Sequence, residues 1–280
     1  MTAPFELVDV RLDHPRGGPP LLTGANLRVA AGEVVLIVGG AGVGTSRLVA
    51  AALGEIPLAT GELRVLGRDV RKLRRSSLRL LRRRIGIVPQ DLCLLEDRSA
   101  QLNVVLPLEI DGIPRSLSIA RAAEGLAAMG LEDVAGIQVD ALPASVRQRV
   151  AVARALVRDP GLVLADHPTS AQDPGGCARV AAALEATARD RGKAVLVFAR
   201  DPVLRAYAEA HAWRQFALVD GELRPLGEIV VDSGAIDRSL VDSESLPNLV
   251  PFPRPDSGGD RPATEPGDPP GVTSINAGNR

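Results

Sequence analysis

The sequence predicts an α/β domain with a parallel sheet covered by helices on both faces. Short apolar runs that fit buried strands, at 34–38 and 162–165, alternate along the chain with segments of helical spacing. A glycine-rich segment at 39–46 lies between the first of these strands and a helix. Strands that alternate with helices usually pair in parallel, and the connecting helices then cover both faces of the sheet.

The remaining elements follow from local patterns in chain order. Alternating or β-branched apolar residues bounded by turn residues indicate strands at 5–11, 25–29, 34–38, 61–67, 84–89, 162–165 and 194–198. Apolar residues at helical spacing indicate helices at 47–53, 116–129, 145–157 and 178–191, and the whole stretch 91–158 has helical spacing. Residues 216–223 are expected to form a hairpin around Gly221.

The chain is expected to divide into a folded domain and a tail. The periodicity fades from about Asp232, and residues 251–280 are rich in proline, glycine, serine and charge, with almost nothing apolar. Such a segment buries too little apolar surface to offset its ordering entropy. We therefore predict a domain over 1–231 and a disordered tail over 232–280.

The composition favours a globular protein without a membrane-spanning segment. Hydrophobic residues make up 45% of the chain, which is ample for a core, but no apolar run reaches the roughly 18 residues of a membrane span. The amino terminus lacks the pattern of a signal peptide. Cys93 and Cys177 match no metal or redox spacing, which favours a reduced, cytoplasmic protein. The net charge of −1 gives no indication of nucleic-acid binding.

The glycine-rich segment resembles a phosphate-binding loop. It fits G-x-x-x-x-G-K-[ST] at every position except that Thr45 replaces the lysine. The residues expected to hold a nucleotide here are Gly39, Gly40, Ala41, Gly42, Val43, Gly44, Thr45 and Ser46. Of the 33 basic residues only Lys72 and Lys193 are lysines, so a basic replacement would be expected to be arginine; threonine is a loss of charge.

Further landmarks follow this loop in a fixed order. They are Gln90 after a strand, the segment 142–149 at the start of a helix, Asp166 at the end of a buried strand, and Arg200 after the next one. Together they resemble the ATP-binding cassette (ABC) family over residues 5–226, and the segment 90–108 is similar to the FtsE/LolD/MacB branch, above all FtsE. The resemblance implies a P-loop NTPase core with a small antiparallel β portion and an inserted helical subdomain at about 91–158.

The resemblance also implies ligands and roles. ATP and Mg²⁺ are the expected cofactors; Arg47, Gln90 and Asp166 join the loop in holding the nucleotide, and Ser46, Gln90 and Asp166 would serve the metal. His167 stands at the position of the family's catalytic glutamate and Arg200 at that of its switch histidine. The signature serine and two glycines are replaced by Pro143, Ala144 and Ser145.

These replacements predict a degenerate subunit that binds ATP weakly and hydrolyses it poorly or not at all. The implied partners are an integral-membrane permease of the FtsX-like type and a second nucleotide-binding subunit, identical or different, with no nucleic acid. This places the chain in the cytoplasm, at the inner face of the cell membrane through its partner. Two alternatives stay open: an active ABC ATPase that drives export or lipoprotein release, and a scaffold without nucleotide.

A basic run at 71–84 has two interpretations. The first is a solvated helix face, and the second is contact with an anionic membrane surface. No aromatic residue interleaves the run, although single-stranded nucleic acid would call for such residues.

Overall fold

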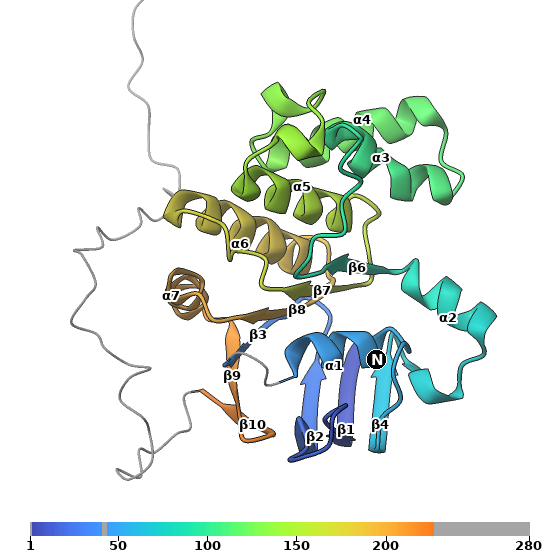
Figure 1. The fold of residues 1–280 in the computed structure, drawn as a ribbon, viewed down its shortest axis with the longest axis vertical. Helices are drawn as coiled ribbons and strands as arrows, with labels where there is room; N and C mark the ends of the chain where they lie inside the picture. Colours follow the sequence, from blue (N-terminus) through green and yellow to red (C-terminus); the bar gives the residue numbers. More distant parts are fainter. Residues whose placement is uncertain (1, 41–43, 227–280) are drawn as a thin grey trace, which may run out of the picture. The chain divides into compact units, whose positions relative to one another are not determined.

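The computed structural model describes residues 2–40 and 44–226. A six-stranded sheet in the order β10-β9-β3-β8-β7-β6 forms the centre of this part of the chain (Figure 1). Its strands are β3 (Val34–Gly39), β6 (Ile85–Val88), β7 (Leu162–Asp166), β8 (Ala194–Ala199), β9 (Arg214–Val219) and β10 (Glu222–Pro225). All neighbours pair in parallel except β9 and β10, which form the expected hairpin.

A second, antiparallel sheet lies beside the first, with the order β2-β1-β4-β5. Its strands are β1 (Phe5–Leu12), β2 (Leu22–Val29), β4 (Thr60–Val65) and β5 (Arg68–Asp69). Helix α1 (Thr45–Ala52) packs between the two sheets and contacts both β4 and β7 (Figure 1). The apolar side chains of α1 therefore join the two sheets into one core.

The other helices cover the opposite face of the parallel sheet or extend from it. They are α2 (Arg75–Arg82), α3 (Ala100–Ile110), α4 (Arg115–Ala128), α5 (Ala144–Leu156), α6 (Pro174–Arg189) and α7 (Pro202–Ala210), with single 3₁₀ turns η1 (Val70–Lys72), η2 (Glu132–Val134) and η3 (Val139–Ala141). Helices α3, α4 and α5 contact one another as a group (Figure 1). None of the helices in the described ranges is long and apolar enough to cross a bilayer.

The central strands β3, β7 and β8 are buried on both faces of the sheet, with alternate side chains in the two cores. Val35 and Ile37 face the cluster shared with α1 and the antiparallel sheet, whereas Leu36 faces the cluster shared with α5 and α6. The same alternation continues in β7 and β8. A parallel sheet covered on both faces needs such uniformly apolar strands, so the expected α/β architecture is confirmed.

The structure corrects several element boundaries. Residues 91–99 form no helix despite their helical spacing, because the chain turns there through Leu92 and Cys93, which both have positive φ. Helix α6 begins at Pro174, four residues before the expected start, because the Asp173 carboxylate caps it by accepting a hydrogen bond from Gly176 N–H at 2.6 Å. Helix α7 was not expected; Asp201 caps it in the same way. The expected tail lies outside the described residues.

The close approach of α5 to β6 generates a stability prediction. A Cβ atom at Gly86 would lie 2.4 Å from the Ala155 carbonyl oxygen and 2.9 Å from Pro160 Cγ. Gly86→Ala should therefore lower the free energy of unfolding by about 1–3 kcal/mol through overpacking. At Gly136 an added Cβ meets nothing within 4 Å, so Gly136→Ala is the matched control. Equal midpoints of the two variants in urea would contradict the packing argument.

Candidate nucleotide and magnesium site

The site forms around the amino terminus of α1. Gly44 precedes the helix with φ of 102°, a conformation that L-residues rarely adopt, and a Cβ there would lie 2.8 Å from Leu21 Cβ. Glycine is therefore required at this position both by backbone conformation and by space. Gly39 ends β3 and Gly40 is exposed beyond it. Ala41, Gly42 and Val43 lie outside the described residues.

Thr45, at the position where the loop pattern has lysine, is buried at the start of α1. Its short side chain carries no charge toward a bound phosphate. The neighbouring Ser46 is exposed, and Arg47 is half-buried with its Nε lacking a hydrogen-bond partner. The helix amino terminus and its free backbone N–H groups still favour an anion.

Asp166 is the residue on which the charged part of the site depends. It is the last residue of β7 and is only 3% exposed. The Ser46 hydroxyl donates a hydrogen bond to Asp166 Oδ2, whereas Asp166 Oδ1 is buried without any hydrogen-bond partner. A buried carboxylate oxygen without a donor is costly unless a cation or water satisfies it.

Ser46 and Asp166 fit a Mg²⁺ ion that keeps several water molecules in its coordination shell. Mg²⁺ prefers oxygen ligands and is usually held by one or two carboxylates together with substrate phosphates. The unpartnered Asp166 oxygen and the Ser46 hydroxyl provide such ligands. Within residues 2–40 and 44–226 no group of three or more His, Cys, Asp or Glu side chains is placed to hold a metal alone. Gln90, exposed two residues after β6, lies at the same edge of the sheet.

His167 lies directly beside this carboxylate. Its Nε2 is 3.9 Å from Asp166 Oδ1, and its side chain is 13% exposed. Burial lowers the pKa of His167 below its usual value, and the charge of Arg200 lowers it further against the opposing effect of Asp166. The imidazole is therefore neutral at pH 7. Arg200 is exposed, one residue after β8.

The backbone at His167 is in the left-handed conformation, with φ of 53°. Its N–H donates to the Phe198 carbonyl at 2.8 Å, and its own carbonyl accepts a hydrogen bond from Gln148 Nε2 at 2.9 Å. The left-handed geometry is strained for a residue other than glycine, so both bonds help to hold the turn that follows β7.

The signature-like segment opens α5. Pro143 precedes the helix without forming a side-chain cap, Pro143 and Ala144 are exposed, and Ser145 is half-buried. Within the described residues, no hydrogen bond or ion pair joins these three residues to Ser46, Asp166 or His167 directly. The connection runs through glutamines: Gln172 Nε2 donates to the Ser145 carbonyl at 2.8 Å and to Gln148 Oε1 at 3.0 Å.

Gln148 is a residue whose role the sequence patterns did not reveal. It is 3% exposed, and its amide joins α5 to the turn after β7. Besides the His167 carbonyl and Gln172, it binds Ser170 Oγ at 2.9 Å and the Ala171 N–H at 3.0 Å. In the sequence, Gln148 is recognisable only as a polar residue at an apolar position of the helix. That pattern does not identify the groups that Gln148 binds.

Arg154 was missed in the same way. From α5 it donates to the carbonyl oxygens of Leu92 and Cys93, in the segment after Gln90; the bond to Cys93 is 2.6 Å long. Both acceptor residues have positive φ. Helix α5 therefore supports two loops at the sheet edge, one through Gln148 and one through Arg154.

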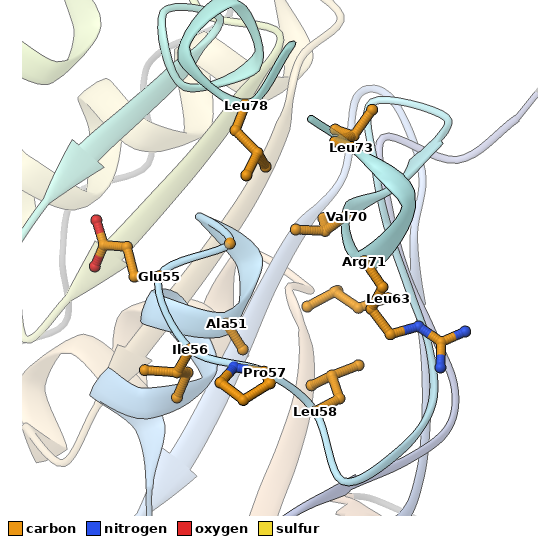
Figure 2. A pocket seen from close by; sticks show the side chains of 11 residues that line it. Ala51, Glu55, Ile56, Pro57, Leu58, Leu63, Val70, Arg71, Leu73 and Leu78 are labelled. Carbon is orange, nitrogen blue, oxygen red and sulfur yellow. The ribbon is translucent and has the colours of Figure 1, made fainter. Parts of the chain in front are cut away.

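A cavity of about 400 Å³ lies elsewhere, near the carboxyl-terminal end of α1 (Figure 2). Ala51, Leu63, Val70 and Leu78 are among its apolar lining residues. Because the glycine-rich segment is at the other end of α1, this cavity is not part of the candidate nucleotide site.

Comparison with known proteins agrees with this architecture. A family model described as ABC transporter matches residues 22–170. The chain is 39% identical over 227 residues to the macrolide export ATP-binding/permease protein MacB of Escherichia coli O157:H7. This alignment covers 80% of this chain and 34% of MacB. It is 37% identical over 204 residues to the methionine import ATP-binding protein MetN of Rhizobium etli, with 72% and 56% covered. The chain thus spans about a third to a half of these curated relatives.

Among solved structures, the dimeric ATP-binding cassette MJ0796 in a post-hydrolysis state bound to ADP and Pi is similar. Its TM-score is 0.72 at 30% sequence identity, and the match covers 79% of this chain and 97% of that one. The structure of CbiO1 from Clostridium perfringens, at 24% identity and a TM-score of 0.69, shares the fold.

The glutamine network generates a prediction on stability. Gln148→Leu leaves several buried polar groups without partners, so it should lower the free energy of unfolding by about 2–3 kcal/mol. The same change at half-buried Gln101, whose side chain makes no hydrogen bond within the described ranges, should have little effect. Denaturant titration of both variants is the measurement, and equal stabilities would show that the network is not stabilising.

The lowered pKa of His167 predicts a pH dependence. In the unfolded chain histidine titrates near ~6.5, so as the pH falls the unfolded chain gains this proton before the folded one does. This contribution to stability is complete above the unfolded pKa, and it is lost as the pH falls from there through the lower pKa of the folded chain. His167→Asn should therefore lose less stability between neutral pH and pH about 5 than the parent chain does. A difference no larger than that caused by His14→Asn would refute the assignment.

Proposed function

The chain belongs to the ABC transporter family, and from this membership we propose that it is a degenerate ATP-binding subunit of an FtsE-like transporter complex. Domains of this family bind ATP with Mg²⁺, work with membrane permeases and form dimers. In the proposal this copy binds ATP weakly and acts on an FtsX-like permease with impaired hydrolysis, through nucleotide occupancy that shifts a dimer between open and closed states.

The observation that carries the proposal is the buried, uncharged Thr45 in the phosphate loop. A charge-assisted hydrogen bond contributes about 1.5–3 kcal/mol, so the missing lysine weakens ATP binding roughly ten- to a hundredfold. Arg47 does not replace it, because residues two apart on a helix point to different faces. The remaining loop glycines, Ser46 and Asp166 still support some affinity.

Impaired hydrolysis is supported by the groups around Asp166. In phosphoryl transfer to water, a side chain must orient the attacking molecule. His167 is a neutral imidazole of shorter reach than glutamate, and it is held beside Asp166. Arg200 carries only hydrogen-bond donors and cannot accept a proton. Pro143 lacks both the hydroxyl and the backbone N–H that a partner's γ-phosphate would meet.

The permease partner is proposed from the segment after Gln90. The likeness to MacB, whose name joins an ATP-binding part to a permease, supports the FtsE/LolD/MacB branch. Arg154 fixes the backbone of Leu92 and Cys93, so the segment presents a defined surface at the edge of the sheet. Docking there would keep the chain at the inner face of the membrane.

An active ATPase that drives export or lipoprotein release is the second candidate. It is favoured by the Ser46–Asp166 arrangement, which retains oxygen ligands for Mg²⁺. The two candidates differ in turnover and not in fold, so the rate of hydrolysis separates them.

We expect the purified chain to hydrolyse ATP at or near background, because both the lysine and the glutamate are replaced. The measurement is phosphate release with and without the permease. Robust turnover that Asp166→Asn abolishes would contradict the proposal, since it would show that this site performs the chemistry.

Restoring the missing charge should strengthen binding without restoring turnover. Thr45→Lys is expected to raise ATP affinity about ten- to a hundredfold in a calorimetric titration, because its ammonium can reach the phosphates. Thr60→Lys adds the same charge at an exposed position of β4 and is the control. Unchanged affinity of Thr45→Lys would mean that the loop does not bind phosphate, which would favour the scaffold alternative.

A further inference from the structure

We infer that the basic segment 71–84 is a docking surface for an anionic lipid bilayer. The segment contains eight basic residues and no acidic one, although the whole chain has a net charge of −1. It includes α2 and lies away from the amino terminus of α1, so it is a separate surface from the nucleotide site (Figure 1). The inference does not depend on nucleotide turnover.

Helix α2 turns its apolar side inward and its basic side outward. Leu81 is 3% exposed, and Leu78 points into the cavity beside α1 (Figure 2). Arg82 fixes the helix further by donating to the Leu53 carbonyl at 2.8 Å. The exposed face carries Arg75 and Arg79, one turn apart.

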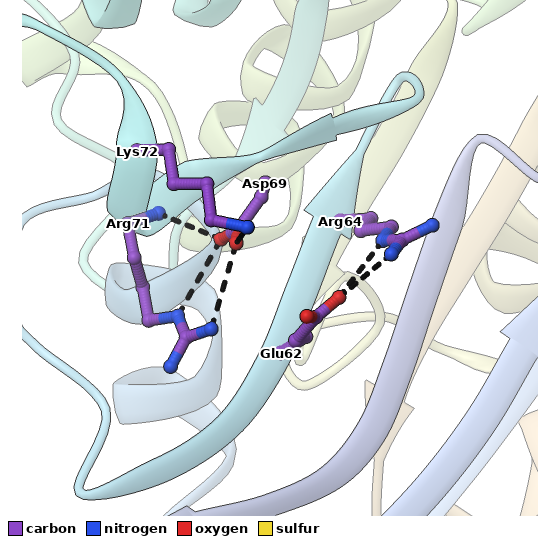
Figure 3. A network of polar contacts seen from close by, with 5 residues as sticks. All are labelled: Glu62, Arg64, Asp69, Arg71 and Lys72. Atoms are coloured by element: carbon purple, nitrogen blue, oxygen red, sulfur yellow. Dashed lines mark hydrogen bonds and ion pairs between the residues drawn. The ribbon is translucent and has the colours of Figure 1, made fainter.

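The arginines of this face have no carboxylate partners among the described residues, unlike other basic residues nearby. Arg64 pairs with Glu62 at 2.7 Å, and Asp69 pairs with Arg71 at 3.5 Å and with Lys72 at 3.3 Å (Figure 3). Inside segment 71–84, the exposed arginines that make no ion pair or side-chain hydrogen bond with any described residue are Arg74, Arg75, Arg79 and Arg84.

The placement of these charges is unfavourable for an isolated helix. Arg74 precedes the first turn of α2 and Arg75 begins it, where the helix dipole favours acidic residues, and no acidic residue is present there. Arg75 and Arg79 are like charges four residues apart, which repel. An opposing anionic surface would attract each of these arginines and so offset both unfavourable terms.

Leu80 points to a bilayer rather than to nucleic acid. It is 61% exposed and lies next to Arg79 on the outer side of the helix. An amphipathic surface that combines basic residues with an exposed apolar side chain matches the interface of an anionic membrane. Single-stranded nucleic acid would instead require aromatic residues for stacking, and the segment has none.

Vesicle flotation of the full chain tests the inference. We expect binding to vesicles of phosphatidylcholine mixed with phosphatidylglycerol, loss of binding at high salt, and none to pure phosphatidylcholine. Each arginine near an anionic surface contributes roughly fivefold in affinity, so Arg75→Gln with Arg79→Gln should weaken binding about 25-fold. Leu80→Ser should weaken it further.

The control removes the same two charges elsewhere, by Arg121→Gln on α4 with Arg205→Gln on α7, both exposed. It should leave vesicle binding unchanged, and circular dichroism should show the fold intact in both double variants. Failure of the parent chain to bind anionic vesicles, or equal weakening by the control, would overturn the inference. So would tighter binding to an oligonucleotide that is insensitive to Leu80→Ser.

Discussion

The parallel sheet is buried on both faces, and this constraint determines where chemistry can occur in the domain. Strands β3, β7 and β8 admit almost only apolar side chains along their length, because each residue faces one of the two cores. Charged groups are therefore confined to the strand ends. Asp166 occupies the last position of β7, Arg200 follows β8, and Ser46 comes after β3 on α1. Parallel pairing brings these ends to one edge, so residues 120 positions apart meet in the Ser46–Asp166 hydrogen bond.

The same constraint makes the loss of positive charge at this edge consequential. Asp166 is buried, and one of its oxygens has no donor. An uncompensated charge in such a place is expensive, so the site favours a cation more strongly than an exposed carboxylate would. His167 does not supply that charge, because burial and Arg200 keep its imidazole neutral. We infer that Mg²⁺, brought by a nucleotide, would compensate Asp166, and that metal and nucleotide would bind together rather than separately.

The sequence predicted the parallel sheet well, since its strands follow from local patterns. Uniformly apolar runs identified β3, β7 and β8, and the glycine loop identified the start of α1 to within two residues. Tertiary contacts decided what was missed. Residues 91–99 have helical spacing, yet hydrogen bonds from Arg154 to Leu92 and Cys93 favour a turn. Gln148 has four hydrogen-bond partners in a loop about twenty residues further along the chain. No sequence pattern predicts these contacts.

Gln148 and Gln172 also link the two surfaces that a dimer of such domains would use. In head-to-tail dimers of this family each nucleotide lies between one chain's phosphate loop and the other's signature segment. Here the carbonyl of Ser145, in the signature segment, is joined through Gln172 and Gln148 to the carbonyl of His167, which is next to Asp166 in the chain. The bonds are 2.8–3.0 Å long and partly buried, so they connect the two surfaces directly. Family residues are replaced on both of these surfaces in this chain, so both nucleotide sites of a dimer with a competent subunit would contain an altered group. We infer that this chain slows ATP hydrolysis in any dimer that it joins.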